Sequence, residues 1–65
     1  MHGIWKHKKT GGIYQFEQEC RIEATNTPAV MYRSLETGIS WVRPLYEFLD
    51  GRFEKIKISA LADPD

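Results

Sequence analysis

The strongest constraint on this chain is a strand–turn–strand pattern in the middle of its sequence. Ala29–Leu35 and Ile39–Arg43 are rich in β-branched and aromatic side chains and alternate in character, as half-buried strands do. Between them, Glu36-Thr37-Gly38 ends in a glycine, which suits a hairpin loop whose last residue needs positive φ. Pro44 has no N–H to give a sheet and predicts the end of the second strand. The hairpin is followed by one predicted helical turn with an apolar stripe of Leu45, Phe48 and Leu49.

The flanking sequence predicts further strands. Ile13–Thr25 alternates between polar and apolar residues, and Gln18 interrupts its apolar row, which indicates a bulge. Arg52–Ile58 is the predicted closing strand, with Ile56 on its apolar face and Phe53 out of register. With a short N-terminal strand, these elements predict a small all-β barrel.

A motif within the hairpin is similar to a family signature. It consists of a Tyr-Arg pair, a Gly-containing turn, Trp-Val-Arg-Pro and a later phenylalanine. This pattern resembles an uncharacterised bacterial and phage family, domain of unknown function 1653. The matching positions are Tyr32, Arg33, Trp41, Val42, Arg43, Pro44, Leu45 and Phe48. The family's opening resembles Lys6, His7, Gly12 and Tyr14, although Thr10-Gly11-Gly12 stands where the family has a shorter Lys-Gly link.

The resemblance covers most of the chain and implies a fold but no activity. The predicted fold class is all-β, a small SH3-like barrel or roll of four to five strands with one short helical turn. We assign residues 1–65 to a single SH3-like domain and expect residues 59–65 to form a frayed tail.

The stability of so short a chain must come from a small apolar core. A single cysteine allows no internal disulfide, and no Cys/His set has the spacing of a zinc site. Cys20 lies on the apolar row of the long strand, which favours a small core residue over a nucleophile. The expected core is Tyr14, Phe16, Ile22, Val30, Tyr32, Val42, Phe48 and Ile56.

The charges balance overall but are unevenly placed. Nine basic and nine acidic side chains cancel, so no overall field attracts nucleic acid. Residues 1–12 nevertheless hold lysines and histidines and no acid, which is typical either of an anion-binding arm or of a solvated strand. The candidate ligand-binding residues are Arg33, Trp41, Arg43, Lys6, His7, Lys8 and Lys9. No catalytic or metal-binding residue is predicted.

Pairing across the predicted hairpin brings three of these candidates together. With a loop centred on Thr37, Arg33 pairs with Trp41 and Met31 pairs with Arg43. The two arginines and the indole then share one face, which suits a phosphate beside a flat ring. In the alternative interpretation Trp41 belongs to the core and the arginines pair with acids: Glu17, Glu19 or Glu47.

These features favour a non-catalytic binding module for an anionic or nucleotide-like ligand, because no nucleophile or acid–base pair stands out. The expected partner is a phosphate-bearing small molecule, and no cofactor is expected. The alternative is a protein–protein interaction module, or a small phage or bacterial inhibitor that docks an aromatic patch. Nucleic acid is not favoured as a partner by a net charge of zero.

Two further expectations concern location and assembly. The sequence has no long apolar run, so we expect no membrane partner and a cytoplasmic location in a bacterial or phage-infected cell. So short a chain is not expected to cover all its large apolar side chains, which predicts a homodimer or larger ring formed through Trp5, Met31, Leu35 and Trp41.

Overall fold

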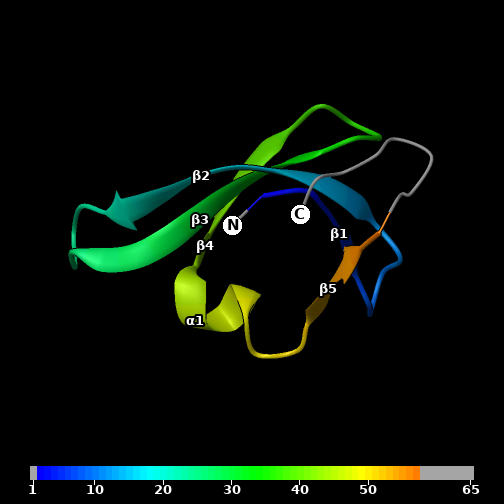
Figure 1. Ribbon diagram of the computed structural model, residues 1–65. Coiled ribbons are helices and arrows are strands. Elements are labelled where there is room, and N and C mark those ends of the chain that lie inside the picture. The colour runs from blue at the N-terminus through cyan, green and yellow to red at the C-terminus, as the bar shows by residue number, and fades with distance from the viewer. Residues whose placement is uncertain (1, 58–65) are drawn as a thin grey trace.

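The computed structural model describes residues 2–57, which form a five-stranded antiparallel sheet with one helical turn (Figure 1). The elements are β1 (Ile4–His7), β2 (Ile13–Ile22), β3 (Thr27–Ser34), β4 (Ser40–Pro44), α1 (Leu45–Phe48) and β5 (Phe53–Ile56). The strand order is β4-β3-β2-β1-β5, and within residues 2–57 no backbone pairing joins the two edge strands, β4 and β5. The predicted all-β fold with one short helical turn is confirmed as an open roll, since the sheet does not close into a barrel within the described residues, and the predicted frayed tail lies outside these residues.

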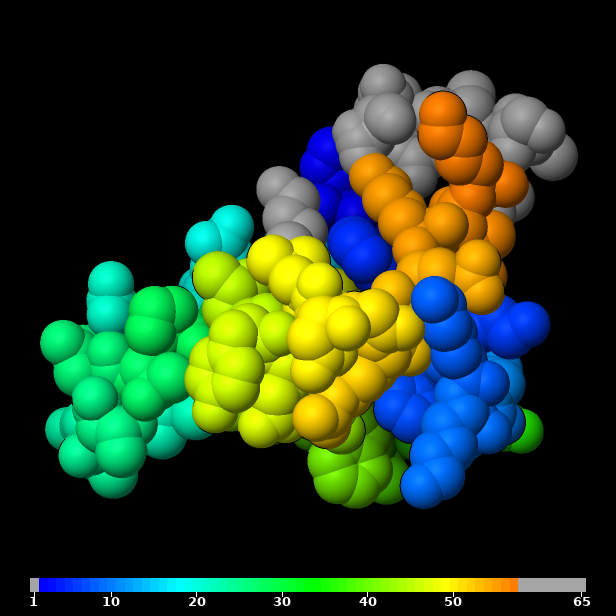
Figure 2. Space-filling view, turned by 90° about the horizontal axis from the view of Figure 1, so that it is seen from below, coloured from blue at the N-terminus to red at the C-terminus, as the bar shows by residue number. Residues whose placement is uncertain are grey.

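A bulge in β2 bends the sheet. Phe16 pairs with Tyr32 but Gln18 pairs with Met31, so the register shifts between them, as the interruption at Gln18 predicted. β1 pairs with β2 only before the bulge, whereas β3 pairs with β2 on both sides of it. The far end of the β2–β3 hairpin therefore projects from the domain, as the cyan and green lobe in Figure 2 shows.

The core is aromatic. Phe48 is fully buried, and its ring stacks on that of Phe53 with centroids 4.5 Å apart, while Trp5 meets it edge-on at 4.9 Å. The buried cluster consists of Phe16, Val30, Tyr32, Phe48 and Phe53, with Trp5, Tyr14 and Leu45 packed against it. Four residues of the predicted core are thus confirmed as buried, and Tyr14 packs against them.

In β5 the core residue is Phe53 rather than the predicted Ile56. Pairing with β1 sets Phe53 opposite His7 and Ile56 opposite Ile4. Residues 53 and 56 point to opposite faces, because side chains alternate along a strand. Phe53 is buried and Ile56 only half-buried. Two other residues that we expected in the core are also half-buried: Ile22 and Cys20.

The central hairpin is shifted by one residue from its predicted register. Tyr32 pairs with Trp41 and Arg33 pairs with Ser40. Because a shift of one residue moves every side chain to the other face, Trp41 and Arg43 lie on the same side as Tyr32 and not on that of Arg33. The same shift makes the predicted core position of Val42 wrong: this side chain is 51% exposed.

The shift arises in the hairpin loop, which has four residues instead of three. The N–H of Ser34 donates to the carbonyl of Ile39 at 2.8 Å, and the N–H of Gly38 donates to the carbonyl of Ser34 at 2.9 Å. The buried Ser34 hydroxyl accepts the N–H groups of Glu36 and Thr37 at 3.2 and 3.0 Å. Gly38 has a φ of 78°, so the prediction of a positive φ at the last loop residue is confirmed.

Pro44 ends β4, as predicted, and α1 begins at once. Proline is tolerated there because β4 is an edge strand. α1 is a single turn closed by the N–H of Leu49, which donates to the carbonyl of Leu45 at 3.1 Å. Leu45 and Phe48 contact the core. Leu49 is 53% exposed, so the prediction that it belongs to the apolar stripe is wrong.

Candidate functional site

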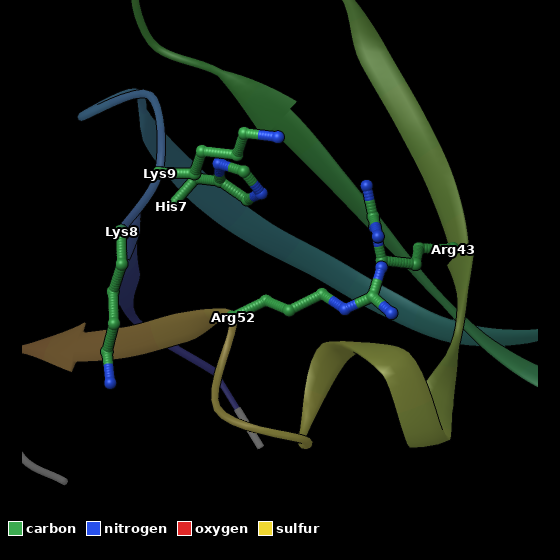
Figure 3. A pocket seen from close by; sticks show the side chains of 5 residues that line it. All are labelled: His7, Lys8, Lys9, Arg43 and Arg52. Atoms are coloured by element: carbon green, nitrogen blue, oxygen red, sulfur yellow. The ribbon is translucent and has the colours of Figure 1, made fainter.

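Basic side chains gather around one open depression on the surface. Its volume is about 640 Å³, and its lining residues are His7, Lys8, Lys9, Arg43 and Arg52 (Figure 3). They come from three separate segments: the end of β1 with the turn after it, β4, and the turn before β5. Figure 2 looks onto this side of the molecule. The β1–β2 turn is blue and lies beside α1 and the turn after it, which are yellow to orange. We call this depression the basic groove.

Backbone hydrogen bonds fix one side of the basic groove. The N–H of Lys8 donates to the carbonyl of Arg52 at 2.9 Å, which joins the β1–β2 turn to the turn before β5. The β1–β2 turn is itself closed by the N–H of Gly11, which donates to the carbonyl of His7 at 2.8 Å. Gly11 has a φ of 78°, a conformation that glycine adopts without strain. These backbone bonds therefore fix the positions from which the basic side chains around the groove extend.

Arg43 is held on the other side of the basic groove by three contacts. Its Nε donates to the Tyr32 hydroxyl at 3.2 Å, its Nη1 donates to Glu47 Oε1 at 3.2 Å, and its guanidinium carbon lies 5.7 Å from the ring centroid of Phe53. The hydrogen bond with Tyr32, aided by the negative charges of Glu47 and Asp50, raises the pKa of Arg43, so this group stays protonated.

Glu47 joins the two arginines of the basic groove. Its Oε1 lies 3.2 Å from Nη1 of Arg43 and 3.5 Å from Nη1 of Arg52. Arg52 also pairs with Asp50 at 3.0 Å. In Figure 3, His7 and Lys9 point toward the arginines, whereas Lys8 points away from them. Within residues 2–57, these two carboxylates pair with the groove arginines and face four lysine and arginine side chains and a histidine, which leaves the groove with an excess of positive charge.

An aromatic hollow of about 240 Å³ adjoins the basic groove and shares two residues with it, His7 and Arg43. Tyr14 and Tyr32 meet edge-to-face in its wall, with centroids 5.2 Å apart, and Trp41 is 50% exposed. A Cβ on Gly12 would lie 3.0 Å from the Tyr14 ring, so the absence of a side chain there leaves room for that ring. The full lining is His7, Thr10, Tyr14, Tyr32, Trp41, Arg43 and Phe53.

Five of the seven predicted site residues lie around these two depressions: His7, Lys8, Lys9, Trp41 and Arg43. Arg33 does not, because the shifted register places it on the opposite face of the sheet. There it pairs with Glu17 at 3.2 Å, and Ser40 donates to the same carboxylate at 2.8 Å. Lys6 is exposed on the face of β1 opposite to His7.

The interpretation of the two hairpin arginines as partners of acids is confirmed. Arg33 pairs with Glu17, and Arg43 pairs with Glu47 while it also lines both depressions. The interpretation of Trp41 as a core residue is wrong, since half of it is exposed. Three other residues are proposed for self-association: Trp5 and Met31 are half-buried, and Leu35 is exposed. A single chain does not test assembly, and the homodimer stays a prediction.

Sequence reasoning missed five residues around the site: Thr10, Tyr14, Tyr32, Arg52 and Phe53. Arg52 follows the Asp50-Gly51 turn, which the sequence does indicate. An antiparallel pairing of the closing strand with the N-terminal strand is the signal that would have placed it beside Lys8. The tyrosines and Phe53 are core residues whose edges reach the surface, and no pattern in the sequence distinguishes them from other core aromatics.

Residues 2–57 contain neither a metal-binding cluster nor a membrane-spanning helix. No group of three or more His, Cys, Asp or Glu side chains in this range is arranged to hold a metal ion. Within the same residues, no helix has the length and apolar character needed to cross a membrane.

His7 Nδ1 lies 3.1 Å from Thr10 Oγ1, a local hydrogen bond that orients the imidazole between the two depressions.

Comparison with known proteins assigns the family. The family model described as "Protein of unknown function (DUF1653)" matches residues 3–58. This span includes all five strands, α1 and every residue that lines the two depressions. No curated protein and no solved structure gives a significant match. The match covers most of the chain and agrees with the signature in the central hairpin, and the chain therefore belongs to the DUF1653 family.

Proposed function

We propose that this protein is a non-catalytic binding module for an anionic or nucleotide-like ligand that bears a phosphate. The observation that carries the proposal is the gathering of five basic side chains from three segments around one groove. Guanidinium forks and ammonium groups are the side chains that bind phosphate most strongly in proteins. The chain is neutral overall, so the local excess of positive charge does not simply follow from composition.

The contacts of Arg43 and Arg52 support a binding role in addition to a structural one. Each guanidinium has five N–H donors, and Glu47, Asp50 and Tyr32 engage only some of them in the described part of the chain. Glu47 therefore holds both guanidiniums at the groove while donors remain for a ligand. A protein partner that docks on exposed apolar side chains is the second candidate, and it is favoured by four residues of the β3–β4 hairpin: Leu35, Ile39, Trp41 and Val42.

The first test compares two double variants that remove equal charge from opposite faces. Lys9→Ala with Arg52→Ala should weaken the binding of inorganic pyrophosphate at least tenfold, because two charged contacts are lost from the groove. Lys6→Ala with Arg33→Ala also removes one lysine and one arginine, but both lie outside the groove, so affinity should stay near that of the wild type. Calorimetric titration or NMR titration measures both.

If both double variants lost the same affinity for pyrophosphate, binding would depend only on the net charge of the protein, and the groove would not be the site. Absence of pyrophosphate and nucleotide binding by the wild-type protein would favour the protein partner instead. Circular dichroism of each variant shows whether the fold is kept.

Glu47→Gln should change stability and binding in opposite directions. The substitution removes the carboxylate that lies between Arg43 and Arg52, so the two cations repel each other and the melting temperature falls. The same loss leaves more positive charge for a ligand, so the affinity for pyrophosphate should rise about fivefold. Asp50→Asn is the control, since Asp50 pairs with Arg52 alone among the groove arginines. Weaker binding by Glu47→Gln would contradict an anion site between the arginines.

A further inference from the structure

We infer that the ligand is a mononucleotide, or a phosphate ester of a comparable flat heterocycle, whose phosphate occupies the basic groove and whose ring occupies the aromatic hollow. The inference rests on the proposed phosphate-binding function and adds the class of ligand. The observation behind the inference is that a cationic depression and an aromatic depression lie next to each other and share two lining residues.

The two depressions lie side by side and share part of their lining. Both are lined by His7 and Arg43, so a ligand that contacts these two residues can extend into either depression. The basic groove alone, at about 640 Å³, has the size of a small-molecule site. The adjoining hollow, at about 240 Å³, is smaller and is lined mostly by aromatic rings, which suits one flat ring more than a second charged group.

The walls of the aromatic hollow offer ring faces and edges. Trp41 is half exposed on the same side of the sheet as Tyr32, with which it pairs. An indole left open to water at the rim of a cationic groove can stack on a heterocycle, and such stacking tolerates any base. The Arg43 guanidinium lies between the hollow and the groove, where a phosphate attached to the stacked ring would meet it.

The charges beyond the groove favour a single nucleotide over a nucleic-acid strand. A strand needs a series of basic residues that continues along its backbone. The other arginine of the hairpin, Arg33, lies on the opposite face and is paired with Glu17. Glu17 offsets the charge of Arg33 on that face, so neither side chain continues the positive charge of the groove.

The test titrates the wild-type protein with ADP, GDP, CDP and UDP, and separately with inorganic pyrophosphate. At least one diphosphate should bind about tenfold more tightly than pyrophosphate, because its base adds a stacking contact. Trp41→Ala should remove about that tenfold gain and leave the affinity for pyrophosphate unchanged. Val42→Ala is the matched control, because Val42 is the next residue, is equally exposed and faces away from the hollow.

The outcomes separate this inference from the proposed function. Pyrophosphate binding that the nucleotides do not improve, with no effect of Trp41→Ala, would overturn the inference and leave the phosphate site standing. No binding of any of these compounds would overturn both. If oligoadenylate bound far more tightly than ADP, with affinity rising with length, the ligand would be a nucleic-acid strand and the mononucleotide assignment would be wrong. The indole N–H resonance of Trp41 gives an independent readout, since it should shift with the bound nucleotide and far less with pyrophosphate.

Discussion

Replacing Phe48 with alanine should remove a large share of the protein's free energy of unfolding. The side chain is fully buried and contacts three aromatic rings, those of Phe53 at 4.5 Å, Trp5 at 4.9 Å and Tyr32 at 5.3 Å between centroids. Removing a buried phenylalanine costs about 3–5 kcal/mol. A domain of this length has a free energy of unfolding of only about 3–10 kcal/mol, so the loss takes a large share of it. Urea denaturation followed by circular dichroism measures the change.

Leu49→Ala is the control for this prediction. Leu49 is the next residue and is also apolar, but 53% of it is exposed, so its truncation should change the free energy of unfolding by no more than about 0.5 kcal/mol. If the Phe48 variant kept a cooperative transition close to that of the wild type, the aromatic cluster around α1 would not be the centre of the core.

Arg43→Ala should show the largest loss of phosphate binding among the single variants of the groove. Arg43 lines both depressions, so its removal affects the groove and the hollow together. A hydrogen bond to a charged group contributes about 1.5–3 kcal/mol, which corresponds to a loss of affinity of up to roughly a hundredfold for pyrophosphate. The melting temperature should also fall, because the bonds with Tyr32 and Glu47 disappear.

Arg33→Ala is matched to this change, since Arg33 is also a hairpin arginine with one carboxylate partner, and it should leave phosphate binding intact. Calorimetric titration gives both affinities, and a thermal melt gives both stabilities. An Arg43 variant that melts early but binds pyrophosphate like the wild type would show that the guanidinium serves the fold alone.

Much of the fold was predictable because the local signals are strong. Alternation marks the strands, Gln18 marks the bulge and Pro44 marks the end of β4, each by a mechanism that acts within a few residues. The aromatic residues Phe16, Tyr32 and Phe48 were found in the core for the same reason: their positions in the periodic pattern fix which way they point.

It was harder to predict which side chains lie on each face of the hairpin, because one additional residue in the loop moves every side chain of the second strand to the other face. Ser34 accepts two backbone N–H groups of the loop and so closes the hairpin one residue earlier than the glycine position indicates. That single difference moved Arg33 out of the site and put Val42 on the surface. The basic groove was missed in part because Arg52 reaches it only through the pairing of β5 with β1, a contact between the two ends of the domain.

The two edge strands, β4 and β5, which no backbone pairing joins within residues 2–57, make the groove a contact between the two ends of the sheet. Arg43 stands on one edge strand and Arg52 directly before the other, so the basic groove spans the gap between the two ends of the sheet. Side chains join the edges there, with Glu47 between the arginines, and such contacts open at lower cost than a strand ladder. A ligand held by both arginines would tie the two ends of the sheet together. The resistance of the protein to proteolysis would then rise with the supply of its ligand, and its abundance in the cell would follow.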